Sequence, residues 1–372
     1  MADLSMSDLR KKYNNFYAPA FDIKIKGKNV VKDLGAGVPS INVSLSCGFD
    51  ASSCSFEVND LYNIEQRKFK DGMLDNYFLL GNVVEVSVGY IKTEMIFMGL
   101  ISTISFSYGS DGAPSISVEC LDIKSRMMAD KLSKEFKERK FTEVAEKVIN
   151  QYKSYKAFNQ VKVDPLEGEE EKETIEKQGE SDYNLLRRIA ETIGYEFYVE
   201  KGDVYFRDSM KDTSTLIELE FGSDIESFRT SRNLVGQVHS VTAKNTSEDT
   251  TEVIKYTAFA SNLGKGKKKT ASDEAKISKG VEKVIVDPKI NKTEDAKKVA
   301  EAELEDLCMG YVRCNGACVG FPEFLPGRFI NLTKLGLNKS NKDTFYVIKV
   351  EHSISSSGYQ VSFEGRMPTV EL

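Results

Sequence analysis

Short segments in which apolar and polar residues alternate fill the first third of the sequence, and this period of two constrains the fold most. They lie at 21–26, 41–45, 56–58, 84–88 and 116–118. Because successive side chains of a strand point to opposite faces, each segment is predicted to be a half-buried β-strand. A longer apolar stretch, 95–104, is interrupted by Gly99, where we expect a bulge or a bend. Short strands separated by Gly, Asn and Asp predict a barrel or a sandwich.

The middle of the sequence changes to a helical period. Over 141–153, apolar residues recur at i, i+3, i+4, i+7, i+8 and i+11, which predicts an amphipathic helix. A second helix is predicted over 181–193, with a serine as its N-cap and Gly194 as its C-terminal stop. Alternating residues on both sides of a Lys-Gly-Asp turn follow at once and predict a β-hairpin over 195–207.

The last third returns to strands, interrupted by one helix. Strands are predicted over 216–221, 235–243, 311–321, 329–332, 345–350 and 359–363. A helix is predicted over 293–307 with Thr293 as its N-cap. Residues 264–283 are rich in lysine and poor in apolar side chains. There we expect a solvated loop, mobile or ordered only by a neighbouring subunit, rather than an electrostatic docking patch.

These patterns indicate a β-rich α+β chain in three parts. Residues 1–125 are predicted to form a first β-barrel, 126–215 an inserted α+β region, and 216–372 a second β-barrel that carries the Lys-rich loop and the last helix. The two β-rich blocks are similar in size and texture, which is compatible with two related barrels. Sequence identity between the blocks does not establish a duplication.

Composition and charge exclude several classes of protein. With 40% hydrophobic and 29% charged residues, the 372-residue chain has globular composition. A net charge of -6 argues against a dedicated nucleic-acid-binding protein, which is usually strongly basic. No apolar run approaches the roughly 18 residues that a membrane-spanning helix needs. The N-terminus lacks the apolar segment of a signal peptide, so we expect synthesis in the cytoplasm and no membrane insertion.

A search for chemistry finds no convincing site. The sequence has no GxxxxGK[ST], GxSxG or HExxH motif, and GKGKKKT lacks the spacing of a phosphate-binding loop. Only His239 and His352 are available for a nucleophilic triad or a zinc site, and pairs among 57 acidic residues are uninformative. The acidic stretch 166–176 is interpreted as solvated surface rather than a cation site. We therefore expect no catalytic residue, no cofactor and no metal.

Cysteines occur at positions 47, 54, 120, 308, 314 and 318. The four-residue spacing of Cys314 and Cys318 suggests a metal site, but both fall on one face of a predicted strand and lack two further soft ligands. Reduced cysteines in the protein core are the favoured interpretation.

Two passages resemble a known family. GESDYNLLRRIAETIGYEFYVEKGDVYF, at 179–206, is similar to a passage of phage late control protein D and of VgrG spike proteins. Further on, an alanine-rich helix leads to FLPGRFINLTKLG and then to FYVIKVEHSISSSGYQVSFEGR. In this closing hairpin the matching positions are held by His352, Gly358, Tyr359 and Phe363. Both passages occur in the family's order.

The resemblance implies a baseplate hub subunit of a contractile phage tail, tailocin or injection system. Members carry two tail-tube-like β-barrels that flank an inserted α+β region. Three subunits would form a homotrimer with six barrels, a pseudo-sixfold ring that joins a hexameric tail tube or tube-initiator protein to a trimeric spike. Baseplate wedge proteins would be further partners, and the chain would reside in the assembled particle.

The resemblance also leaves alternatives. VgrG proteins continue into a spike, whereas this sequence stops after the closing hairpin, so a separate spike protein is expected. No catalytic residue of the family has a counterpart here, and the chain is expected not to be an enzyme. A hub with bound cargo or with a hidden wall-degrading activity remains an alternative, as does a stand-alone β-sandwich binding module or adhesin.

Overall fold

The computed structural model describes residues 2–109, 112–169, 171–208, 212–245, 253–263, 268–276, 281–287, 290, 292–338 and 340–371. The N-terminal part builds six strands of the main sheet: β1 (Ala20–Ile25), β3 (Ile41–Ser46), β4 (Ser53–Val58), β7 (Val83–Gly89), β8 (Thr93–Ser107) and β9 (Ser115–Leu121). They pair antiparallel in the order β3-β4-β9-β8-β7-β1, and we call them the first module. The strands predicted from alternation are confirmed. Around them lie α1 (Met6–Lys12), β2 (Lys28–Asn29), β5 (Tyr62–Asn63), β6 (Lys68–Phe69) and α2 (Met73–Asn76).

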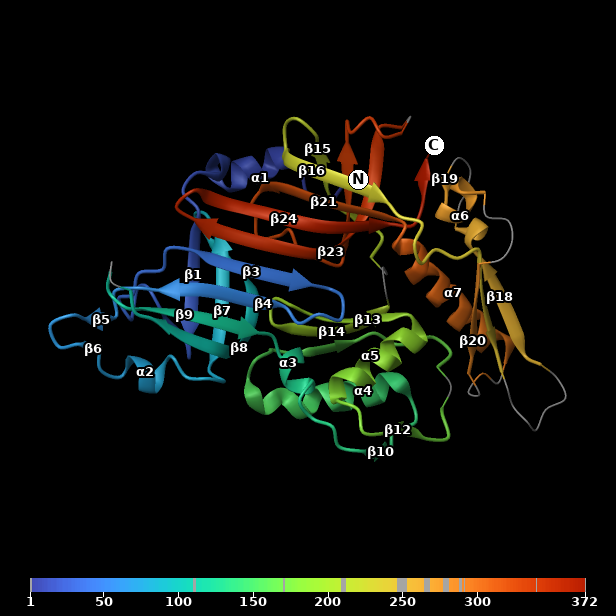
Figure 1. The fold of residues 1–372 in the computed structure, drawn as a ribbon, viewed down its shortest axis with the longest axis horizontal. Helices are drawn as coiled ribbons and strands as arrows, with labels where there is room; N and C mark the ends of the chain where they lie inside the picture. Colours follow the sequence, from blue (N-terminus) through green and yellow to red (C-terminus); the bar gives the residue numbers. More distant parts are fainter. Residues whose placement is uncertain are drawn as a thin grey trace.

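The long strand β8 bends the first module over its core. Its first half pairs with β7 up to Leu100, and its second half pairs with β9 from Leu100 to Ser107. Gly99 stands at the change, where an added Cβ would lie 2.5 Å from the carbonyl oxygen of Leu121. The register then shifts at Ser102, between Ile101 and Thr103. As a result β1 and β7 run crosswise to β3 and β4 (Figure 1).

The C-terminal part builds a second module of six strands. They are β15 (Thr215–Glu220), β16 (Ile225–Arg232), β21 (Val312–Val319), β22 (Arg328–Thr333), β23 (Lys342–Ser355) and β24 (Gly358–Met367), in the order β16-β21-β24-β23-β22-β15. Numbered by their sequence within each module, both orders read 2-3-6-5-4-1. In the direction of strand pairing, the modules differ only at the first strand. It is antiparallel to its neighbour in the first module and parallel in the second.

The repeat extends to single residues. In β23 the register shifts at Ile348, between Val347 and Lys349, as it does at Ser102 in β8. When the two bulges are aligned, Cys54 corresponds to Cys314, each opposite the sixth strand of its module. The two modules therefore share a topology and a register, although their sequences do not reveal it.

The two modules form one continuous sheet of 13 strands, because β23 pairs antiparallel with β3. One hydrophobic core cluster spans both modules. The predicted β-rich α+β fold class is thereby confirmed, with the addition that the two β-rich blocks are fused edge to edge.

The inserted region has its own core. It consists of α3 (Lys124–Met127), β10 (Lys134–Phe136), α4 (Phe141–Asn150), β11 (Val161–Val163), β12 (Ile175–Lys177), α5 (Asp182–Ile193), β13 (Tyr195–Glu200) and β14 (Asp203–Asp208). Helix α5 begins where the Ser181 hydroxyl accepts a hydrogen bond from the Asn184 amide, and it ends at Gly194 in the left-handed conformation. Both helices and the hairpin lie where the sequence predicts them. Figure 1 shows α4 and α5 below the main sheet.

The sequence does not reveal a further unit inside the second block. Strands β17 (Ser240–Lys244), β18 (Lys255–Phe259) and β20 (Glu282–Val286) form a separate sheet against α7 (Thr293–Met309), with its own core. Two predictions are corrected here. The strand predicted from residue 235 begins at Ser240, and the N-cap of α7 is Lys292 rather than Thr293.

The Lys-rich loop is only partly described, since 264–267 and 277–280 lie outside the described residues. Within 268–276, the prediction of a loop is wrong. Strand β19 (Lys268–Lys269) pairs with β25 (Val370–Glu371), and Thr270 caps the short helix α6 (Ala271–Glu274). The cap satisfies amide groups at the helix start, and Ala271 is buried against the main core. No helix in the described part of the chain is both long and apolar enough to span a bilayer.

Candidate assembly interface

The joint between the two modules is a buried, fully paired strand edge. Residues Lys349–Ile354 of β23 lie opposite Ile41–Ser46 of β3. The side chains that face the core across the joint are all buried: Val350, His352 and Ile354 from β23, and Leu45, Val43 and Ile41 from β3. The Cys47 amide extends the joint by donating to the Ile348 carbonyl at 3.1 Å. Apolar burial and backbone pairing thus hold the modules together.

One strand edge in each module is open at the position that corresponds to the joint. Among the described residues, the second half of β8 pairs with β9 alone, and β16 pairs with β21 alone. The β8 edge exposes Phe106 and, just beyond it, Tyr108, which are 43% and 67% accessible. Phe228 of β16 is half-buried and contacts Phe345, with ring centroids 6.1 Å apart. Exposed strand edges with apolar side chains mark surfaces that pair with another chain.

A buried polar network attaches the inserted region to the sheet. Glu196 of β13 accepts hydrogen bonds from Arg207 Nε and from the Tyr346 hydroxyl, both at 2.7 Å. Burial raises the pKa of Glu196, while the positive charge of Arg207 opposes that rise. Arg207 Nη2 also donates to the Gly327 carbonyl at 2.9 Å. These bonds connect the hairpin β13–β14 to β23 and to the turn before β22.

Two buried lysines stabilise the inserted region and its connection to β9. Lys177 Nζ lies 2.6 Å from both Asp130 and Asp182. Burial lowers the pKa of Lys177, but these hydrogen bonds outweigh it and leave the pKa raised. Lys124 donates to the carbonyls of Gly48 and Asp50, and burial lowers its pKa. Sequence patterns did not identify either lysine, because the residues around a lysine in sequence do not indicate whether its side chain is buried.

The histidines and cysteines have structural surroundings. His352 Nδ1 lies 2.7 Å from the Tyr359 hydroxyl, and burial lowers the His352 pKa to about 3. His239, the residue before β17, contacts the Ser272 hydroxyl of α6 at 3.2 Å. Cys314 is a buried free thiol whose pKa burial raises to about 12. Within the described ranges, His, Cys, Asp and Glu side chains form no group of three or more suited to a metal ion.

The family-like residues of the closing hairpin serve the fold. Gly358 begins β24 directly after the turn from β23 and adopts φ +128°, a conformation that favours glycine. Tyr359 and Phe363 are buried in the core cluster of the main sheet. Gly358, Tyr359 and Phe363 therefore do not contribute to a polar site on the surface.

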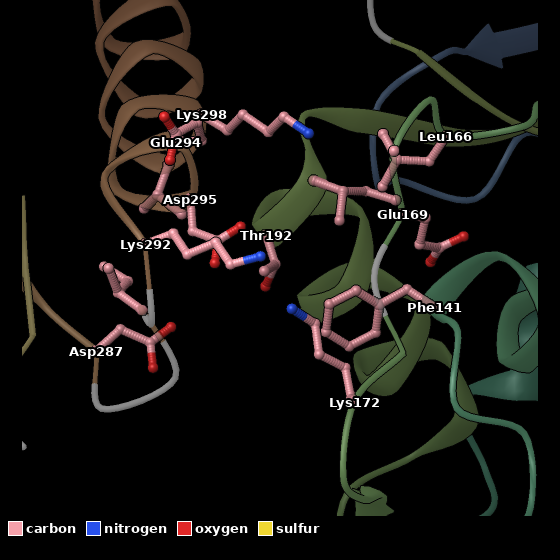
Figure 2. A pocket seen from close by; sticks show the side chains of 14 residues that line it. Phe141, Leu166, Glu169, Lys172, Thr192, Asp287, Lys292, Glu294, Asp295 and Lys298 are labelled. Atoms are coloured by element: carbon pink, nitrogen blue, oxygen red, sulfur yellow. The ribbon is translucent and has the colours of Figure 1, made fainter.

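One cleft separates the inserted region from α7. Its cavity of about 400 Å³ is lined on one side by Phe141 and Leu166 and on the other by side chains near the start of α7. Figure 2 shows Lys292 and Lys298 with Glu294 and Asp295 on the α7 side, and Lys172 with Glu169 on the opposite side. Charges of both signs spread over separate elements do not form a catalytic constellation.

Solved structures with this fold come from phage-like tails. The 43 kDa tail protein of prophage MuSo2 from Shewanella oneidensis superposes with a TM-score of 0.69 at 17% identity, over 94% of this chain and 99% of that one. A tail protein from Neisseria meningitidis MC58 gives 0.66 at 16% identity, over 94% and 97%. The E. coli c3393 protein, described as a type VI secretion component similar to T4 tail proteins, gives 0.57 at 10% identity, over 92% and 76%.

These likenesses establish the fold, which this chain shares with those two tail proteins and with the secretion-system component. No curated protein matches the sequence significantly. A family model described as the Alg8 N-terminal domain matches residues 18–356, most of the chain. The chain belongs to the family of that description, the Alg8 N-terminal domain family.

Proposed function

We propose that this protein is a structural baseplate hub subunit of a contractile phage tail, tailocin or injection system. The observation that carries the proposal is the duplicated module, with two six-stranded halves of one topology in a single continuous sheet. Three copies would present six modules, so a homotrimer would show near-sixfold symmetry toward a tube and threefold symmetry toward a spike. The likeness of the whole fold to tail proteins supports this role.

The proposal includes partners and domain boundaries. A hexameric tail tube or tube-initiator protein would bind one side of the ring, a separate trimeric spike the other, and wedge proteins the rim. We place the first module within 1–125, the inserted region within 126–215 and the second module within 216–372. In Figure 1 the inserted region lies below the main sheet and the unit around α7 to its right, and wedge contacts would form on these parts.

The mass of the purified protein and its image in the electron microscope test the hub. We expect a particle of three times 41.7 kDa that averages to a ring with six similar lobes. A protein that stays monomeric at tens of micromolar contradicts the hub. Wall hydrolysis by the pure protein, if it persisted through independent preparations, would contradict the proposed absence of enzymatic activity.

A further inference from the structure

We propose that neighbouring copies join by antiparallel pairing of β16 of one copy with the second half of β8 of the next, in the register that β3 and β23 adopt within the chain. This inference rests on the proposed ring and names its contact surface. It follows from the equivalence of the two modules, because the joint inside the chain shows how one module binds another.

The joint uses the fifth strand of the second module and the second strand of the first. After the bulge at Ile348, β23 turns its outer edge to β3. The fifth strand of the first module is β8, which has the same bulge at Ser102. After that bulge, β8 has an open outer edge within the described residues. The second strand of the second module is β16, which also has an open edge.

The repeat fixes the register of the proposed pair. When the bulges are aligned, Thr103 is equivalent to Lys349. Following the paired residues from β9 through β4 leads to Ser44 of β3, and the same path from β24 through β21 leads to Ser231 of β16, so Ser231 is equivalent to Ser44. Since Glu351 lies opposite Ser44 in the joint, its equivalent Ser105 is placed opposite Ser231 of the next copy. The same register places Phe106 opposite Thr230, and Tyr108 opposite Phe228.

The side chains fit this register. In the joint, His352 and Ile354 are 1% and 2% accessible, whereas their equivalents Phe106 and Tyr108 are 43% and 67% accessible although their rings contact Phe69 and Tyr62. Pairing with β16 would cover both aromatic rings with the half-buried Phe228 and the stem of Arg232. On the opposite face, Ser105 and Ser107 would meet Ser231 and Arg229, which suits a face open to water.

A second copy of this chain is the occupant that the structure favours. The contact would continue the sheet through the same kind of edge that already joins β3 to β23. It is also head-to-tail, because each copy offers the open second half of β8 in its first module and the open edge of β16 in its second module. Head-to-tail contacts close into rings when the rotation fits.

Cysteine crosslinking tests the register. The variant Ser105→Cys/Ser231→Cys should form disulfide-linked oligomers on mild oxidation, since both positions are exposed and directly opposed. The control Ser105→Cys/Thr230→Cys shifts one partner by a residue and turns its Cβ to the other face. We expect at least ten-fold more crosslinked product from the first pair. Equal yields in an oligomer that still forms overturn the pairing and leave the hub intact.

A charge substitution provides a second measurement. Phe106→Lys should weaken self-association at least ten-fold, because it places a charge where the core would close. Ile91→Lys, at an exposed position in the β7–β8 turn, is the matched control and should leave association unchanged. Thermal melts of both variants check that the subunits stay folded. Normal association of folded Phe106→Lys overturns the pairing, whereas a monomeric wild-type protein overturns both the pairing and the hub.

Discussion

The Tyr346 hydroxyl donates a hydrogen bond to the Glu196 carboxylate across 2.7 Å, joining strands that are 150 residues apart in sequence. Arg207 completes the arrangement at 2.7 Å from the other carboxylate oxygen. The inserted hairpin is thus attached to β23, the strand that also forms the joint between modules. Its position relative to the main sheet is therefore set by buried hydrogen bonds.

Removing the cation from this network should destabilise the protein strongly. Arg207→Met leaves the buried Glu196 without its charged partner, and we expect a loss of about 3–5 kcal/mol in the free energy of unfolding. The control is Arg187→Met, which breaks a half-exposed pair with Glu191 and should cost less than about 1 kcal/mol. Urea denaturation of both variants checks the difference. Similar losses would mean that the network does not stabilise the junction.

The bend of β8 requires a glycine at position 99. In Gly99→Ala the new methyl group would meet the Leu121 carbonyl oxygen at 2.5 Å and the Phe97 ring at 2.7 Å. Because part of this obstacle is backbone, we expect a loss of about 1–3 kcal/mol. Gly112→Ala has no neighbour within 4 Å and should change stability by less than about 0.5 kcal/mol. Thermal unfolding of the two variants measures this difference in stability.

One pair of equivalent cross-strand positions holds its larger residue on the third strand in the first module and on the sixth strand in the second module. Phe56 lies opposite Val118 in the first module, whereas Gly316 lies opposite Phe363 in the second. A Cβ at Gly316 would contact the Phe363 ring, so Gly316→Ala should cost about 1–3 kcal/mol.

A smaller residue at 363 should relieve that cost. The double variant Gly316→Ala/Phe363→Leu should be more stable than the sum of its single changes predicts, by at least about 0.5 kcal/mol. Denaturant unfolding of the complete cycle measures this coupling. Phe363→Leu combined with Gly112→Ala serves as the additive control, and additivity in the test pair would contradict the proposed contact.

Acid should destabilise the core at His352. Its pKa is about 3 in the folded protein and near 6.5 when exposed, so the unfolded state binds the proton first. This contribution leaves stability unaffected above pH 6.5 and lowers it as the pH falls toward 3, by up to about 1.4 kcal/mol per pH unit. His352→Gln should flatten that part of the pH–stability curve measured by urea denaturation. An unchanged slope between pH 6 and 4 would show that another group is responsible.

Local patterns were enough to predict the individual elements. The alternation of Phe21, Ile23 and Ile25 identified β1, and the serine cap with Gly194 bounded α5, because both patterns express the geometry of the backbone itself. The unit around α7 was missed. Its strands β18 and β20 are short, and neither alternates regularly between buried and exposed side chains, so no clear pattern marks them.

The sequence by itself determined most of the strands and helices, and its family-like phrases suggested a tail protein. Only the tertiary structure decided that the two β-rich blocks are one module repeated. Cys54 and Cys314 correspond through the strands that they pair with, and strand pairing is a long-range property absent from local patterns. The open edges of β8 and β16 were likewise invisible in sequence, because an apolar residue such as Phe106 has the same pattern whether its strand has one neighbour or two.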